Sequence, residues 1–247
     1  MKRLLILGGT ADARALAAAV AETLAGRAEA VTSWAGRTGR APDVAGETRV
    51  GGFGGSAGMV DYIQRETIDM VIDATHPFAE TISDHAYDAA LIAQVPRLGL
   101  IRPPWRLPPG SRWVEVANLE AAAEALGKFA HRVFLTSGRQ TIDAFADVAD
   151  VWFLVRLIDP PAESLPLAAY EVTTGRPPFT LEHEKALIAD HNIDTLVSKS
   201  SGGPLPAKIS AAVEMGLPMV LIAPPPPVPG ARAESVAAAL EWIERQL

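Results

Sequence analysis

Cysteine is absent from the 247-residue chain. Its absence excludes disulfide bonds, thiolate-bound zinc or iron–sulfur sites, and cysteine nucleophiles. Long apolar runs are also missing, because no stretch reaches the roughly 20 consecutive apolar residues that a membrane-spanning helix needs, and no signal-peptide pattern is present. We therefore expect a cytoplasmic protein with no membrane partner.

Positive charge is in the minority. Lysine and arginine total 22 against 29 aspartates and glutamates, and the formal net charge is −7. A general nucleic-acid binder carries a basic stripe, so we expect no nucleic-acid partner. A locally basic site for an anionic small molecule is compatible with this balance. Hydrophobic residues make up 49% of the chain, which predicts a well-packed core.

The chain opens with a short apolar run, residues 3–7, that suits a buried parallel strand. A glycine turn and an Ala/Leu-rich helical stretch follow, and this order leaves backbone N–H groups where a phosphate can bind. The full G-x-G-x-x-G fingerprint is absent, however, so a plain strand-to-helix connection is an equal alternative. The residues predicted to form the phosphate site are Gly8, Gly9, Thr10, Asp12 and Arg14.

Strand-like and helical stretches alternate along the chain, which is the pattern of a parallel sheet covered on both faces. The proline-rich segment 102–110 interrupts this alternation, because proline removes hydrogen-bond donors. A similar order of strand, polar loop, helix and strand recurs on both sides of it. We predict two similar α/β domains, residues 1–104 and 105–247, facing each other across a cleft. The alternative is that the repeat reflects only the βαβ order that is common to α/β proteins.

Four polar loops follow predicted strands in the first half: GGTADAR, TSWAGRTGR, GGFGGS and DATHPFA. Parallel strands would bring them to one edge of the sheet. A dinucleotide site usually has a carboxylate after its second strand, but this chain has Ser33, Arg37 and Arg40 there. A hydroxyl and guanidinium groups suit a 2′-phosphate, which favours NADPH over NADH, unless the arginines are only solvated charges. The glycine-rich loop adds Gly52, Phe53 and Gly54 to the predicted cofactor contacts.

The stretch DATHPFA is unusual for a plain strand-to-helix turn. Asp73 ends an apolar run, where an unpaired carboxylate would be costly. Thr75 and His76 are predicted to contact the cofactor, and Asp73 and His76 are the candidates for a catalytic role, although no catalytic residue is assigned. The alternative is that Asp73 or Thr75 caps the next helix and Pro77 begins it.

In the second half, the loops TSGR and KSSGGPLPAK follow strands and combine hydroxyls, glycine N–H groups and positive charge. That combination binds carboxylates or phosphates. Lys208, Arg156 and Arg176 would form a basic wall beside these loops if they cluster, and are surface charges if they do not. No histidine has a partner at a metal-ligand spacing, so no metal is expected.

Together, LILGGTADAR, DATHPFA, TSGR and SKSSGGPLPAK resemble the precorrin-6A reductase family of cobalamin biosynthesis, in its metal-free and cobalt-precorrin versions. The motifs cover nearly the whole chain, and DATHPFA and GGPLPAK are the specific ones. The resemblance implies two Rossmann-like domains with the active site in the cleft between them. It also implies an NADPH-dependent reduction of one carbon–carbon double bond in a polycarboxylate macrocycle, precorrin-6A, to give precorrin-6B.

In this interpretation, residues 1–104 bind NADPH and residues 105–247 bind the tetrapyrrole. The predicted substrate contacts are Ser137, Arg139, Arg176, Lys199, Ser200, Ser201, Gly202, Gly203 and Lys208. Other enzymes of the corrin pathway are the expected kind of protein partner. A cofactor-free tetrapyrrole lyase or cyclase and a non-enzymatic nucleotide sensor are the competing functions.

Overall fold

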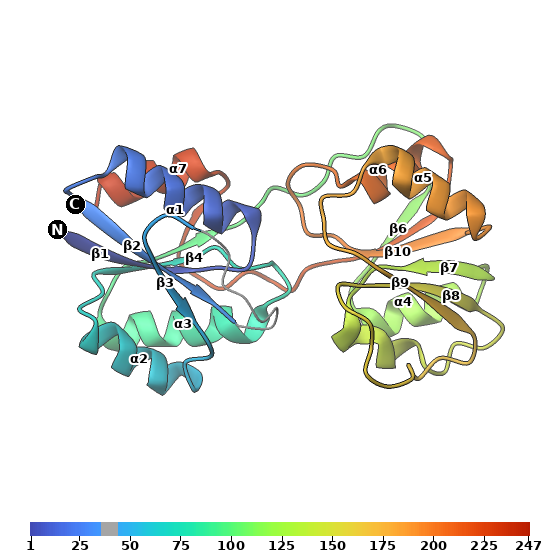
Figure 1. Cartoon of the computed structure of the whole chain (residues 1–247), viewed down its shortest axis with the longest axis horizontal. Helices are drawn as coiled ribbons and strands as arrows, with labels where there is room; N and C mark the ends of the chain where they lie inside the picture. The colour runs from blue at the N-terminus through green and yellow to red at the C-terminus, as the bar shows by residue number, and fades with distance from the viewer. Residues whose placement is uncertain (36–43) are drawn as a thin grey trace. The chain divides into compact units, whose positions relative to one another are not determined.

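A computed structural model describes residues 1–35 and 44–247 of the chain. The chain forms two compact units, one made of Met1–Pro103 and Pro225–Leu247 and the other of Pro104–Pro224. Each unit is a six-stranded parallel sheet with helices on both faces (Figure 1). The prediction of an α/β fold with two parallel sheets is confirmed. Within the described residues, no helix is long and apolar enough to cross a membrane.

The first unit has the strand order β12-β5-β4-β1-β2-β3. Its elements are β1 (Lys2–Leu7), α1 (Ala11–Thr23), β2 (Ala28–Trp34), β3 (Glu47–Val50), α2 (Gly55–Arg65), β4 (Met70–Asp73), α3 (Glu80–Ala93), β5 (Arg97–Leu100), β12 (Ala231–Ala233) and α7 (Val236–Glu244). Strand β1 shows why this sheet is covered on both sides. Leu4 and Ile6 are buried in the cluster formed with α1 and α7, whereas Leu5 and Leu7 are buried in the cluster formed with α2 and α3.

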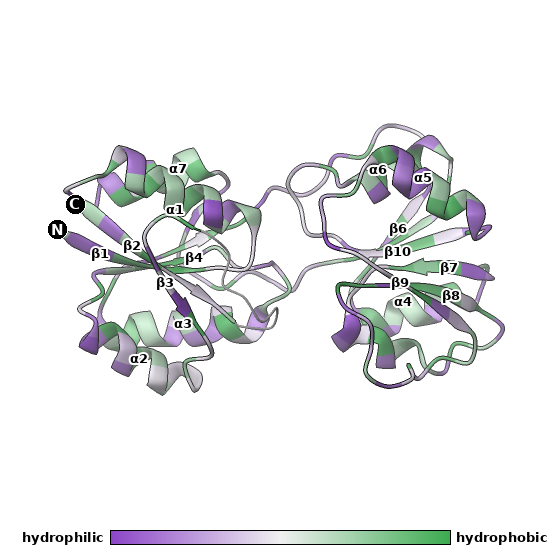
Figure 2. Cartoon of the chain, viewed as in Figure 1, coloured by the Kyte–Doolittle hydropathy of each residue, from purple (hydrophilic) through white to green (hydrophobic). Residues whose placement is uncertain are grey.

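The second unit has the strand order β6-β11-β10-β7-β8-β9. Its elements are β6 (Trp113–Val116), α4 (Leu119–Leu126), β7 (Arg132–Leu135), the 3-10 helix η1 (Arg139–Phe145), β8 (Trp152–Leu157), β9 (Tyr170–Thr174), α5 (Leu181–Asp190), β10 (Thr195–Lys199), α6 (Ala207–Glu214) and β11 (Met219–Ile222). Hydrophobic residues run along the strands of both units, and the helices are mixed (Figure 2). Thr180 caps α5, and its Oγ1 accepts a hydrogen bond from the N–H of His183 at 3.2 Å.

The two sheets have the same order when β1 to β5 are matched with β7, β8, β9, β10 and β11. Asp69 and Asp194 occupy matching places before β4 and β10. The N–H of Asp69 donates to the carbonyl of Arg3 at 2.8 Å, and the N–H of Asp194 donates to the carbonyl of Arg132 at 2.9 Å. The repeat in the sequence therefore reflects two copies of one sheet architecture.

The first sheet takes its sixth strand, β12, from the C-terminal segment of the chain, which corrects the predicted domain ends. The sequence-based division assigns residues 225–247 to the second domain, but β12 pairs with β5 and α7 packs on α1. Ala239 and Ile243 of α7 are fully buried there. Strand β12 completes the edge left beside β5, and the apolar face of α7 covers the sheet next to α1, so the C-terminal segment belongs to the first unit. The proline-rich run at 224–227 is the connection back to it.

Candidate functional site

Three of the four loops predicted to converge in the first unit follow β4, β1 and β3, whose carboxyl ends lie at one edge of the parallel sheet. The fourth follows β2, and its residues 36–43 lie outside the described residues. Thr10 joins two of the loops, since its Oγ1 donates to the carbonyl of Ala74 at 2.7 Å and accepts from the N–H of Ala13 at 3.1 Å. Thr10 thus caps α1 and holds the glycine turn against the DATHPFA loop. Arg37 and Arg40 lie outside the described residues.

Gly8 and Gly9 have different surroundings. The N–H of Gly8 donates to the carbonyl of Ser33 at 2.8 Å, and a Cβ on Gly8 would lie only 3.1 Å from that oxygen. Gly9 has a φ of +121°, and a Cβ placed there would meet no described atom within 4 Å. Gly8 is therefore required for packing against β2, whereas Gly9 leaves open space before the N-terminus of α1. An anionic ligand can approach the backbone there.

Asp12 and Arg102 form an ion pair beside the same turn. Asp12 lies in the first turn of α1 and accepts from Nε of Arg102 at 2.5 Å. Arg102 follows β5, and sequence reasoning did not single it out because its partner lies far away in the chain. The negative charge of Asp12 is stable in the first turn of α1, because it faces the positive end of the helix. Arg14, two residues further along α1, is exposed.

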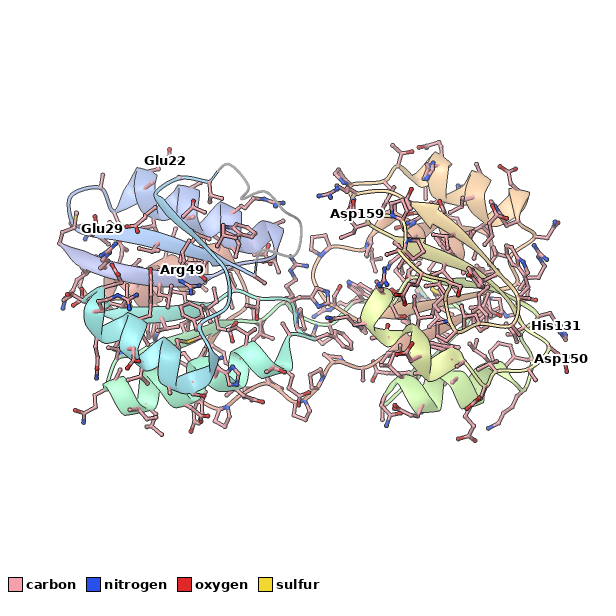
Figure 3. The ribbon with its side chains drawn as sticks, turned by 60° about the horizontal axis from the view of Figure 1, so that its bottom comes forward. Glu22, Glu29, Arg49, His131, Asp150 and Asp159 are labelled. Atoms are coloured by element: carbon pink, nitrogen blue, oxygen red, sulfur yellow. The ribbon has the colours of Figure 1, made fainter. Side chains whose placement is uncertain are left out.

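Arg49, at the end of β3, is a second residue that sequence reasoning missed (Figure 3). Its Nη1 donates to Ser33 Oγ at 3.1 Å and to the carbonyl of Gly51 at 2.6 Å, and its Nη2 donates to the carbonyl of Gly52 at 2.7 Å. The guanidinium lies 3.8 Å from the centre of the Phe53 ring. Burial lowers the pKa of Arg49, yet guanidinium groups remain charged in proteins. The structure thus places a cation beside Ser33.

The parallel register explains this contact, because Ser33 of β2 pairs directly with Arg49 of β3. A usable signal was present in the sequence, namely an arginine just before the glycine-rich loop. Gly54 ends that loop as the N-cap of α2, where no side chain caps the helix. The unsatisfied N–H groups of α2 are therefore a second possible anion contact at this edge.

Asp73 is only 6% exposed, and both of its carboxylate oxygens have partners. Oδ2 accepts from Nη2 of Arg97 at 2.6 Å, and Oδ1 accepts from the hydroxyl of Thr75 at 2.7 Å. These contacts satisfy the buried charge and shape the loop. Helix α3 begins at Glu80 with Ala79 as its N-cap, so the alternative in which Asp73 or Thr75 caps that helix is wrong.

His76 is the exposed member of the same loop. Its Nδ1 accepts from the N–H of Phe78 at 3.3 Å, and the two rings lie 5.7 Å apart. In the tautomer that this hydrogen bond selects, the proton is on Nε2, which can donate to a ligand.

In the second unit, the TSGR loop follows β7. The hydroxyl of Thr141 lies 2.8 Å from Ser137 Oγ and 2.8 Å from the carbonyl oxygen of Gly138. Ser137 is buried, whereas Arg139 is exposed at the start of η1. The loop therefore has an ordered hydroxyl at its base and a positive charge at its surface.

A lysine connects the TSGR and KSSGGPLPAK loops. Nζ of Lys208, in the first turn of α6, donates to Thr136 Oγ1 at 2.8 Å. The hydroxyl of Thr136 in turn donates to the carbonyl of Val197 at 2.9 Å. Burial, followed by the nearby charge of Arg156, lowers the pKa of Lys208 to about 8. Burial also lowers the pKa of Lys199, at the end of β10.

Arg156 and Glu184 form an ion pair close enough to Lys208 to affect its pKa. Nη1 and Nη2 of Arg156 donate to the two carboxylate oxygens of Glu184 at 2.6 and 2.8 Å, and Glu184 is 1% exposed. The guanidinium lies 4.6 Å from the ring centre of Phe134 and 4.1 Å from that of Phe179. Such a pair is costly to break from one side, because the remaining charge would stay buried. Arg156, one of the two arginines of the predicted basic wall, is therefore paired with its own carboxylate.

The predicted substrate residues do not all lie together. Residues 199–203 and Lys208 lie around the end of β10 and are partly or fully buried, and Ser137 follows β7, the neighbouring strand. Arg176 instead follows β9 at the edge of the sheet, where its Nη2 donates to Asp159 at 3.1 Å. Arg176 and Asp159 are both exposed. The central group is thus separated from Arg176 by strand β8.

These observations define a two-unit Rossmann-like α/β protein with polar loops at the carboxyl edge of each sheet. The chain belongs to the family described as precorrin-6x reductase CbiJ/CobK, whose model matches residues 3–244. The resemblance read from the motifs is therefore confirmed.

Relatives match along nearly the whole chain. The chain is 45% identical over 246 residues to a precorrin-6A reductase of Rhodococcus erythropolis, covering 98% of each protein. It is 29% identical over 236 residues to a cobalt-precorrin-6A reductase of Priestia megaterium, covering 90% of each. A solved structure named CobK precorrin-6A reductase matches with a TM-score of 0.92 and 38% identity, over 100% of this chain and 97% of that one.

Proposed function

We propose that the chain is an NADPH-dependent precorrin-6A reductase, which reduces one carbon–carbon double bond of the macrocycle to give precorrin-6B in cobalamin biosynthesis. The observation that carries this proposal is the family match over residues 3–244. The relatives' names describe reductases, which favours reduction over a lyase reaction and over a non-enzymatic sensor. The greater identity is to the relative named without cobalt, 45% against 29%, which supports the metal-free substrate. We place the reaction in the cytoplasm.

The first unit is proposed to bind the cofactor. The open space at Gly9 and the N-terminus of α1 fit a pyrophosphate. Ser33 and Arg49 fit a 2′-phosphate, since a hydroxyl and a guanidinium lie 3.1 Å apart where an NAD site would place a carboxylate. When bound, the dihydronicotinamide supplies a hydride. Gly8, Asp12, Arg14, Thr75, His76 and the Gly52–Gly54 turn remain proposed contacts around it.

The second unit is proposed to bind the tetrapyrrole through its carboxylates. Lys199, Arg139 and Lys208 supply positive charge, and Ser137, Ser200 and Ser201 supply hydroxyls. The N–H groups of Gly202 and Gly203 add donors next to them. Arg176 is retained as an outlying contact, because its ion pair with Asp159 is exposed and exposed pairs are weak. The chain's own contribution to the reaction is orientation of the substrate and compensation of its negative charge.

The test is incubation of the protein with precorrin-6A and either NADPH or NADH. We expect oxidation of NADPH and a product heavier by one hydride and one proton, with a slower reaction for NADH. An unchanged tetrapyrrole mass in the presence of NADPH would contradict the proposed reaction. Equal kcat/KM for both dinucleotides would contradict the proposed 2′-phosphate site alone.

A further inference from the structure

The proposed reduction requires a proton as well as a hydride, because each carbon of the double bond gains one hydrogen. The contacts described so far orient the substrate but leave the source of this proton unassigned. We propose that the ammonium group of Lys208 donates the proton to the macrocycle. This inference rests on the proposed function.

The amine of Lys208 is held in a fixed position. Lys208 lies in the first turn of α6, and its Nζ donates to Thr136 Oγ1 at 2.8 Å. The hydroxyl hydrogen of Thr136 is directed to the carbonyl of Val197 at 2.9 Å, so the Thr136 oxygen is left to accept from Lys208. The amine is thereby held where the loops after β7 and β10 meet. Side chains that donate protons in catalysis need a fixed position of this kind.

The charges around the amine of Lys208 are mainly positive. Arg156 of β8 and Lys199 of β10 are positive and disfavour a further cation, whereas Glu184 of α5 favours one. Both carboxylate oxygens of Glu184 are already engaged by Arg156, at 2.6 and 2.8 Å. The N-terminus of α6 adds the positive end of a helix dipole. Lys208 is therefore a cation held in a positive environment.

The resulting acidity matches the task. Burial, followed by the charge of Arg156, lowers the pKa of Lys208 to about 8. At neutral pH most of the amine still carries its proton, and the proton is released more readily than from an ordinary lysine. A general acid works best when its pKa lies near the pH of the reaction. Arg156 cannot take this role, because a guanidinium does not lose its proton in proteins.

The proposed step adds one hydride and one proton to the double bond. The hydride and its electron pair join one carbon of the double bond, and the π electrons move to the neighbouring carbon. That carbon takes a proton from Nζ of Lys208, which becomes a neutral amine. Water then returns a proton to the amine, and the dinucleotide leaves in its oxidised form.

The discriminating variant is Lys208→Arg. An arginine keeps the charge that a carboxylate contact needs but does not donate a proton to carbon. We expect kcat to fall by roughly 100-fold or more, which is the usual contribution of a general acid. The KM for precorrin-6A and the Kd for NADPH should change by no more than roughly threefold, since the charge is retained. Lys128→Arg, at an exposed lysine just after α4 that pairs with Glu124, is the matched control and should leave kcat unchanged.

Two further readouts separate proton donation from a structural role. The kcat of the unmodified enzyme should fall above pH 8, by about tenfold per pH unit, because only the ammonium form donates. This alkaline limb should be absent from the residual activity of Lys208→Arg. Methylammonium should restore part of the activity of Lys208→Ala, with a dependence on the concentration of the protonated amine.

The outcomes are distinct. If the wild-type enzyme reduces precorrin-6A and Lys208→Arg has a nearly normal kcat, the assignment of Lys208 is wrong and the proposed reductase activity stands. An alkaline limb that persists in the variant, or a loss seen only in KM, would also overturn it. A wild-type enzyme that does not reduce precorrin-6A would overturn both proposals. Unfolding curves and NADPH affinity show whether each variant is folded.

Discussion

Strands β1 and β7 occupy the same central place in their sheets, but the loops that follow them differ in chemistry. After β1 the chain presents glycine backbone and the N-terminus of α1, and Thr10 holds the turn in place. After β7 it presents hydroxyls, with Lys208 donating to Thr136. One scaffold thus carries a backbone-lined edge in the first unit and a cation-lined edge in the second. The two units thus differ in the chemistry of these loops and share the order of their strands.

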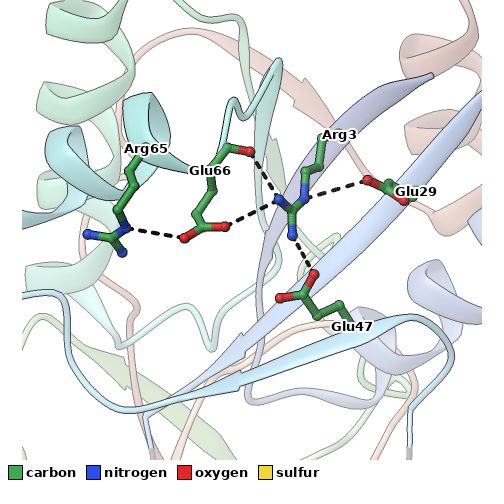
Figure 4. A network of polar contacts seen from close by, with 5 residues as sticks. All are labelled: Arg3, Glu29, Glu47, Arg65 and Glu66. Atoms are coloured by element: carbon green, nitrogen blue, oxygen red, sulfur yellow. Dashed lines mark hydrogen bonds and ion pairs between the residues drawn. The ribbon is translucent and has the colours of Figure 1, made fainter.

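The amino-terminal edges of the two sheets, where β1 and β7 begin, also differ. Arg3 at the start of β1 makes ion pairs with Glu29, Glu47 and Glu66 (Figure 4). Arg132, its counterpart at the start of β7, instead donates to the carbonyl of His191 at 2.6 Å and lies 4.0 Å from the ring centre of Trp152. The same position is satisfied by carboxylates in one unit and by a carbonyl and an aromatic ring in the other.

The largest effect is expected for Gly9→Val, which tests the phosphate site of the first unit. A branched side chain would fill the open space at Gly9, and the loss of about two phosphate hydrogen bonds predicts a roughly 100-fold or greater loss of NADPH affinity. Tetrapyrrole binding should be unchanged. The control is Gly26→Val, because Gly26 also has a positive φ, +78°, and open space around it, but lies at the other end of α1. Normal NADPH binding by Gly9→Val, measured by nicotinamide fluorescence, would contradict the proposed phosphate site.

The second unit is tested with Lys199→Ala and Arg139→Ala. Each lost charged contact is worth about 1.5–3 kcal/mol, so kcat/KM for precorrin-6A should fall by roughly 10- to 100-fold with NADPH affinity unchanged. Higher salt should weaken tetrapyrrole binding more than NADPH binding where the contacts are exposed. Paired titrations with NADPH and with the tetrapyrrole measure both effects. The division between the units is wrong if these variants lose NADPH and keep the tetrapyrrole.

A smaller effect is expected for Arg49→Ala. Arg49 already shares its donors with Ser33 and two carbonyl oxygens, so we take the lower value for a charged contact, about 1.5 kcal/mol, which predicts a roughly tenfold weaker binding of NADPH. NADH binding should change little. Arg65→Ala is the control. Both guanidinium groups lie over the ring of Tyr62, at 5.0 Å for Arg49 and 5.5 Å for Arg65, but Arg65 is paired with Glu66. Equal losses of NADPH and NADH in Arg49→Ala would show that Arg49 supports the loop and does not select the cofactor.

Features that depend on neighbouring residues are predicted from the sequence, whereas features that depend on contacts between distant segments are not. The apolar run at residues 3–7 is a local feature, and its prediction as a buried strand holds in β1. Strand β12 has three residues and no periodic pattern, so its place beside β5 depends on the rest of the fold. The contact between Arg49 and Ser33 requires the register of two strands, and the partner of Asp73 is Arg97 of β5. Contacts that join separate loops are therefore the part that sequence patterns do not predict.

The smallest expected effect concerns Asp69 and Asp194, the matching residues before β4 and β10. Asp69 Oδ1 accepts from Nζ of Lys2 and Oδ2 from the N–H of Arg3, both at 2.8 Å. Asp194 Oδ2 accepts instead from the N–H groups of His131 and Arg132, at 3.0 and 2.9 Å. Burial alone would raise the pKa of Asp69, but the hydrogen bonds from Lys2 and Arg3 lower it below its ordinary value of 3.8.

Because the folded state lowers this pKa, the stabilisation by Asp69 is fully present above pH 3.8 and is lost as the pH falls through the folded pKa. Asp69→Asn should lower the free energy of unfolding of the first unit by about 0.5–1 kcal/mol at pH 7, the scale of an exposed ion pair, and the difference should disappear in stronger acid. Hydrogen exchange of the β1 amides, compared with wild type at each pH, measures this effect. In Asp194→Asn the amide oxygen can still accept both N–H groups, so the β7 amides should be less affected at pH 7. A loss of protection in Asp69→Asn that is the same at pH 7 and well below pH 3.8 would show that the charge of Asp69 is not what stabilises β1.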